Sequence, residues 1–179
     1  TFNTSSLAEY NSISDIKKLQ YDGVDIGYAA LSSYVSHTRN NNPSFNTAFR
    51  NYFDRLLLNQ VMLIHGFEKL LERIKPDVVS VFNARPHDVR PVLRVANQKQ
   101  IDVRVVEAVV PDAENKLQIV YHNSMPQSID YRTKLIKQAW EKSTLSNEEK
   151  EKVSKSFYEK RRNNVLTQDS FVYTLGQKK

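Results

Sequence analysis

Residues 75–90 read KPDVVSVFNARPHDVR, an apolar run that ends abruptly in polar and charged side chains. The run Val78–Phe82 has the length and the β-branched composition of a buried strand. Pro86 suits the first turn of a helix, and apolar side chains then recur at spacings of three and four. These apolar residues are Val89, Val92, Leu93 and Ala96. A second strand is favoured over residues 101–110. Two strands joined by a helix should be parallel, with a right-handed crossover.

The preceding sequence is predicted to be mostly helical. Apolar residues keep a regular three-four spacing over Ser44–Ile74, which predicts a long amphipathic helix. A shorter helix is expected over Gly27–Arg39, and Asn40–Pro43 is a loop.

The sequence that follows predicts one more strand, two helices and a terminal strand. Leu117–Tyr121 is the strand candidate. Ser128 can cap a helix over Ile129–Lys142, whose buried side is predicted to hold Tyr131, Leu135, Ile136, Ala139 and Trp140. Ser146 and Glu149 form a capping box ahead of a helix over Asn147–Asn163. Phe171–Tyr173 begins what reads as a further strand.

These elements together predict the α/β class: a Rossmann-like three-layer domain with a mostly parallel sheet and a long N-terminal helix. We expect one domain over residues 1–179, with residues 1–43 as a helical and loop lead-in. Ligands of such sheets bind beyond the carboxyl ends of the strands. The polar residues that end each apolar run are therefore the first candidates for a site.

Composition excludes several classes of function. The 179 residues contain no cysteine, which rules out disulfides, thiol catalysis and cysteine-bound zinc. Four glycines permit neither a G-x-G-x-x-G turn nor a Walker loop. The four histidines show no His-x-x-x-His spacing, so no metal site is predicted. No apolar run reaches about 18 residues, and no secretory leader is visible, so a cytoplasmic protein is expected.

The net charge of +6 is concentrated near the C-terminus, where residues 126–179 carry 12 basic and 7 acidic groups. Acidic residues at helical spacing offer partners, so a solvated helix face is the simplest interpretation. An anionic membrane surface, an anionic ligand and nucleic acid stay open as alternatives. Nucleic acid is the least favoured partner, because basic-aromatic interleaving of the RNA-binding kind is absent.

Several short motifs resemble those of bacterial surface and capsular polysaccharide biosynthesis proteins, which are glycosyltransferase-like. The motifs are Lys75-Pro76-Asp77, Val81-Phe82-Asn83-x-Arg85, Arg90-Pro91-Val92-Leu93-Arg94, Val105-Val106-Glu107, Tyr121-His122-Asn123-Ser124-Met125-Pro126-Gln127-Ser128-Ile129, Phe157-Tyr158-x-x-Arg161-Arg162 and Asp169-Ser170-Phe171-x-Tyr173-Thr174-x-Gly176-Gln177. They cover most of the chain from about Ser32 onward. The family pattern often has Gly where this chain has Ala84.

The resemblance implies a two-Rossmann-domain (GT-B) enzyme, of which this chain would be an excised N-terminal part that holds the acceptor. The acceptor would be a sugar or a lipid-linked sugar. The nucleotide-sugar donor would bind a missing C-terminal domain, so no cofactor is expected in this part, and the isolated part should be inactive. A cytoplasmic enzyme of this kind could associate with the inner face of the membrane.

Sugar transfer needs a base near the acceptor hydroxyl and cationic or hydrogen-bonding groups for the departing phosphate. Glu107 and His122 are the candidate catalytic residues. The candidate acceptor- or phosphate-binding residues are His37, Arg39, Asn83, Arg85, Arg90 and Asn123. We hypothesise that Arg85, Arg90, Glu107 and His122 converge on one groove.

Each candidate also has a purely structural interpretation. Glu107 could pair with Arg85 across adjacent strand ends, and His122-Asn123 could form a turn after its strand. The alternative function is a noncatalytic α/β module that binds anions, nucleic acid or a membrane surface.

Overall fold

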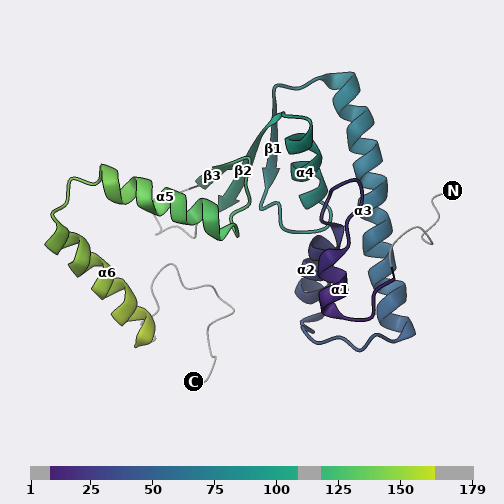
Figure 1. Ribbon diagram of the computed structural model, residues 1–179, viewed down its shortest axis with the longest axis horizontal. Helices are drawn as coiled ribbons and strands as arrows, with labels where there is room; N and C mark the ends of the chain where they lie inside the picture. Colours follow the sequence, from purple (N-terminus) through teal and green to yellow (C-terminus); the bar gives the residue numbers. More distant parts are fainter. Residues whose placement is uncertain (1–8, 109–117, 164–179) are drawn as a thin grey trace. The chain divides into compact units, whose positions relative to one another are not determined.

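The computed structural model describes residues 9–108 and 118–163. The chain divides into two compact units (Figure 1). One spans Thr1–Glu107 and Val120–Ser128, and the other spans Ala108–Ile119 and Ile129–Lys179. The strand predicted over Phe171–Tyr173 lies outside the described residues.

Three helices open the first unit: α1 (Ile13–Lys18), α2 (Ile26–Thr38) and α3 (Thr47–Ile74). Both longer helices were predicted from periodicity, and the structure confirms them. The Asn46 side chain caps α3 by accepting a hydrogen bond from the Phe49 backbone N–H at 2.9 Å. The long helix ends at Ile74, and its C-cap residue, Lys75, has a left-handed φ of 51°.

Aromatic side chains fill the space between α3 and the segments that precede it. Phe49 stacks on Phe53 with ring centroids 5.2 Å apart, and Tyr34 of α2 meets Phe49 edge-on at 5.0 Å. Tyr10 is in contact with both phenylalanines. All four aromatic side chains are buried, and they form part of the hydrophobic core of the first unit together with aliphatic residues such as Ile16 and Leu57.

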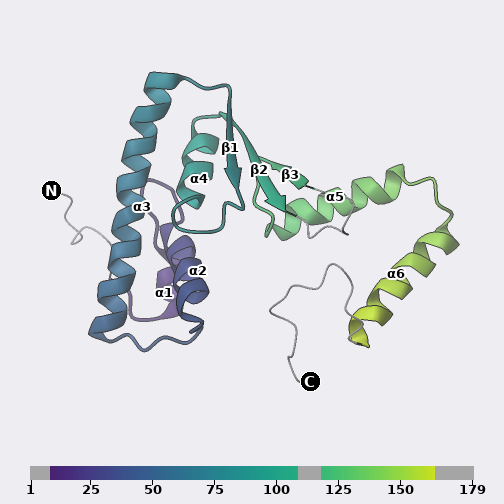
Figure 2. The same ribbon diagram turned by 180° about the vertical axis from the view of Figure 1, so that it is seen from behind.

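The strands are β1 (Val78–Phe82), β2 (Asp102–Ala108) and β3 (Gln118–His122), in the spatial order β1-β2-β3. β1 and β2 are parallel, as predicted, with Val78 opposite Asp102 and Phe82 opposite Val106. Helix α4 (Arg90–Gln98) connects them and packs against α3 and α2 (Figures 1 and 2). Pro86 lies before this helix rather than in its first turn, because α4 begins four residues later.

The predicted Rossmann-like three-layer domain with a mostly parallel sheet is wrong. The sheet is small and mixed, and helices predominate. Asn123, directly after β3, donates its backbone N–H to the Val103 carbonyl near the start of β2, at 2.8 Å. The end of β3 therefore lies beside the beginning of β2, so these two strands are antiparallel. Nine residues separate them, fewer than the dozen or so that a parallel crossover requires.

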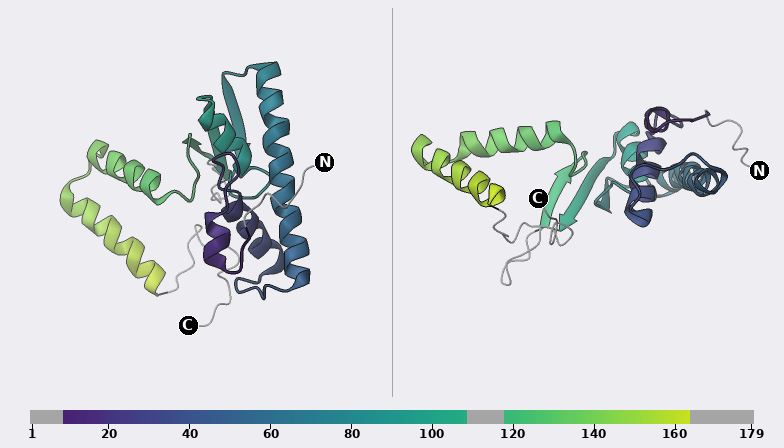
Figure 3. Two further views of the ribbon diagram at one scale, coloured as in Figure 1. Left: turned by 45° about the vertical axis from the view of Figure 1, so that its right-hand side comes forward. Right: turned by 90° about the horizontal axis from the view of Figure 1, so that it is seen from below.

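The second unit contains α5 (Ile129–Lys142) and α6 (Asn147–Arg162) (Figure 3). The capping box is confirmed: the Ser146 N–H donates to Glu149 Oε2 at 2.8 Å, and the Glu149 N–H donates to Ser146 Oγ at 3.2 Å. The predicted buried side of α5 is wrong, since no residue of this helix is buried. Lys150 lies over the Trp140 ring, 5.1 Å from its centroid. Within the described ranges, no helix combines the length and apolarity needed to span a bilayer.

Candidate anion-binding site

The candidate site begins where β1 ends. Asn83 and Ala84 both adopt left-handed backbone conformations, with φ values of 62° and 56°. The Asn83 N–H donates to the Val106 carbonyl at 2.9 Å, and its side-chain Oδ1 accepts the Arg85 N–H at 3.3 Å. An asparagine tolerates this conformation and often closes a turn in this way, whereas alanine is strained in it. The turn sends the chain from the sheet edge toward α2.

Helix α2 presents one polar stripe to this loop, since residues three and four apart share a helix face. Ser33 is buried and accepts the backbone N–H of His87 at 3.0 Å, and its Oγ also lies 2.9 Å from His87 Nδ1. Ser36, one turn later, accepts a hydrogen bond from Arg85 Nη2 at 3.5 Å. Two residues of the loop are thus joined to two serines of the helix.

His37 extends the stripe toward α3. Its Nδ1 lies 2.9 Å from the hydroxyl of Tyr52, and both side chains are exposed. We name the group formed by Ser33, Ser36, His37, Tyr52, Arg85 and His87 the α2–loop cluster. It combines an arginine, two imidazoles and three hydroxyls at the carboxyl end of β1.

Burial lowers the pKa of His87 below the usual value of a histidine. The carboxylate of Asp88 acts in the opposite direction, and the neighbouring His37 adds to the lowering. His87 is therefore mainly neutral at pH 7, and Arg85 supplies the permanent positive charge of the cluster.

Arg90 lies outside this cluster. It is 9% exposed and donates from Nη2 to Asp25 Oδ2, while Arg94 Nε donates to Asp25 Oδ1 at 2.9 Å. Burial alone would raise the pKa of Asp25, but the hydrogen bonds from Arg94 and Arg90 outweigh it, and the pKa is lowered. Arg90 therefore joins the start of α4 to the start of α2, which gives it a structural role.

Glu107, Gln127 and Arg39 lie outside the α2–loop cluster. Glu107 follows Val106, the partner of Phe82, so it shares the sheet edge with Asn83 and is half-buried. Gln127 also reaches this edge, where its Nε2 lies 3.5 Å from Asn83 Oδ1. Arg39 is exposed in the left-handed C-cap position of α2.

His122 and Asn123 lie at the opposite edge of the sheet, because β3 is antiparallel. Asn123 Oδ1 accepts the Val103 N–H at 2.7 Å, and its carbonyl accepts Asn97 Nδ2 at 3.2 Å. These bonds agree with the turn role considered for Asn123. The hypothesis that Arg85, Arg90, Glu107 and His122 converge on one groove is therefore wrong.

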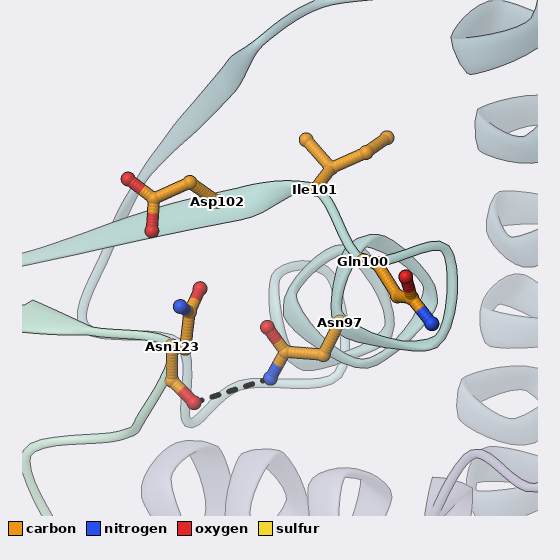
Figure 4. A pocket seen from close by; sticks show the side chains of 5 residues that line it. All are labelled: Asn97, Gln100, Ile101, Asp102 and Asn123. Atoms are coloured by element: carbon orange, nitrogen blue, oxygen red, sulfur yellow. Dashed lines mark hydrogen bonds between the residues drawn. The ribbon is translucent and has the colours of Figure 1, made fainter.

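This opposite edge contains a cavity of about 290 Å³. Its lining residues are Asn97, Gln100, Ile101, Asp102 and Asn123. Figure 4 shows that Asn97 and Asn123 meet there, while the Gln100 side chain points away from both. The cavity lining contains no basic residue, so it is a poorer match for a phosphate than the α2–loop cluster.

Comparison of this chain with family models, with curated proteins and with solved structures finds no match. Among residues 9–108 and 118–163, no group of three or more His, Cys, Asp or Glu side chains is arranged to hold a metal ion.

Two residues of the α2–loop cluster, His37 and Arg85, were predicted from the sequence. The other members, Ser33, Ser36, Tyr52 and His87, were not. Two features of the sequence pointed to the serines and to His87. Ser33 and Ser36 lie four residues and one residue before His37, and His87 lies two residues after Arg85 in the loop that follows the strand. The contact between these two segments is not visible in either of them alone.

Proposed function

We propose that the α2–loop cluster binds a phosphate-bearing ligand, and that this ligand takes part in a sugar transfer in which the chain serves the acceptor side. The convergence of Arg85 and two histidines on the end of β1 carries the proposal. Arg85 and the hydroxyls of Ser36 and Tyr52 are suited to phosphate oxygens, and loops at strand ends commonly supply binding residues.

The sugar-transfer part rests on the resemblance to surface polysaccharide enzymes, supported by the position of Glu107. Glu107 shares the carboxyl edge with Asn83 and is a carboxylate that could accept the proton of a sugar hydroxyl. His122 is not part of this proposal, because it lies at the opposite edge.

Binding can be tested with glucose 1-phosphate as the anionic probe and glucose as the neutral one. The ring signals of His37 and His87 are followed by NMR as each probe is added. We expect glucose 1-phosphate to shift these signals and glucose to leave them unchanged.

The matched variants are Arg85→Gln in the cluster and Arg132→Gln on the exposed surface of α5. Arg85→Gln should weaken binding of glucose 1-phosphate about tenfold, because a charge-assisted hydrogen bond is lost. Arg132→Gln should bind like the wild type. Equal responses to both sugars, or unchanged binding by Arg85→Gln, would refute the proposed site.

A further inference from the structure

The buried hydroxyl of Ser33 has few hydrogen-bond partners within reach. It is 3% exposed in the middle of α2, so solvent cannot satisfy it. Within the described part of the chain, its two hydrogen-bond contacts are both with His87, at the backbone N–H (3.0 Å) and at ring Nδ1 (2.9 Å).

The roles of these two contacts can be assigned by counting donors and acceptors. A backbone N–H can only donate, so Ser33 Oγ accepts there. The hydroxyl hydrogen then needs an acceptor, since a buried donor without one is costly. His87 Nδ1 is the acceptor within reach, and it can accept only when it carries no proton.

We propose that Ser33 is a positioning residue that holds His87 as the Nε2–H tautomer, so that the ring presents a neutral hydrogen-bond donor to the ligand of the α2–loop cluster. The ligand part of this inference rests on the proposed function. Phosphate oxygens are acceptors, so an Nε2–H donor suits them without a charge on the imidazole. Arg85 then supplies the charge and His87 the direction of the hydrogen bond.

The assignment predicts the sign of a pKa change. Donation from Ser33 to Nδ1 stabilises the neutral ring, so Ser33→Ala should raise the pKa of His87. If the ring instead donated from Nδ1 to Ser33, the same substitution would lower that pKa. The charged and titratable groups near His87 are Asp88 in its own loop, His37 on α2 and Arg85, and all three are retained in the variant.

The experiment is an NMR titration of the histidine ring signals, with His87 assigned through loss of its signal in His87→Gln. We expect the wild-type spectrum at neutral pH to show Nε2–H for His87. Ser33→Ala should raise its midpoint by about 0.5 to 1 pH unit, the equivalent of one ordinary hydrogen bond. Ser32→Ala, at the adjacent and half-buried position, is the matched control and should leave the midpoint unchanged.

A wild-type Nδ1–H signal, or a midpoint that falls or stays constant in Ser33→Ala, would overturn the assignment. Ser33→Ala also removes the acceptor of the His87 backbone N–H, but alanine favours a helix, and the wild-type tautomer signal tests the assignment without any substitution. The titration is read without ligand, whereas a second titration with glucose 1-phosphate tests donation to the ligand. Nε2–H without phosphate binding would support the tautomer assignment and overturn the phosphate site.

Discussion

Single residues of the first unit show how far local sequence can predict a site. Arg85 was singled out because it follows an apolar run predicted to be a buried strand. The residues of that strand, β1, are half-buried or exposed, but Arg85 does lie in the α2–loop cluster. Arg90 looked equivalent in the sequence, but Asp25, 65 positions away, forms an ion pair with it. Nothing local distinguishes the two arginines, because the partner of each is set by how α2 packs against the loop and α4.

Tyr10 gives a pH-dependent prediction at the same scale. Its hydroxyl donates to Asp54 Oδ1 at 2.7 Å, and burial, followed by the Asp54 carboxylate, raises its pKa far above the ordinary value near 10. The unfolded phenol loses its proton near pH 10 while the native phenol keeps it. Stability contributed by Tyr10 is therefore complete below pH 10 and is lost as the pH rises above it.

Urea unfolding at pH 8 and pH 10.5 tests this expectation in wild type and in Tyr10→Phe. The fall in the free energy of unfolding between the two pH values should be smaller in the variant, which has no phenol to titrate. An equal fall in the two proteins would show that Tyr10 is not responsible.

At the scale of elements, the contact between α1 and α2 depends on Gly27. A Cβ at this position would lie 1.8 Å from the carbonyl oxygen of Ile16 and 3.0 Å from Leu19 Cβ. The backbone of α1 would have to move, so Gly27→Ala should lower the free energy of unfolding by about 2 kcal/mol or more. Gly66, inside α3, would meet nothing within 4 Å.

Gly66→Ala is therefore the matched substitution, and its effect on the free energy of unfolding should be opposite to that of Gly27→Ala. It should stabilise the protein by about 0.5 to 1 kcal/mol. Urea unfolding of both variants measures the difference. A neutral Gly27→Ala would contradict the close helix packing, and a destabilising Gly66→Ala would contradict the open surface at that position.

Element positions were more predictable than their arrangement. The bounds of β1 and α5 agree with the sequence prediction, because an apolar run or a helical period reports directly on the chain that carries it. The direction of β3 was missed, although the few residues between the predicted second and third strands already argued for a hairpin. Because β3 is antiparallel to β2, His122 and Asn123 lie at the edge of the sheet opposite the candidate site.

At the scale of the whole molecule, periodicity shows which residues share a face but not what covers that face. The stripe on α3 is buried by α2, α4 and the aromatic cluster, whereas the stripe on α5 is exposed among the described residues. Both stripes look alike in the sequence. The division into two units therefore follows from packing, which no single segment encodes.

Two isoleucines test this difference between the units. Ile64 of α3 is 1% exposed, and Ile136 of α5 is 65% exposed. Ile64→Ala should cost about 2 to 5 kcal/mol of unfolding free energy, since it removes buried methyl groups and leaves a cavity. Ile136→Ala should change it by less than about 0.5 kcal/mol, because its side chain already meets solvent and alanine favours a helix. Urea unfolding measures both substitutions. A cost at Ile136 similar to that at Ile64 would show that the exposed face of α5 is covered in solution.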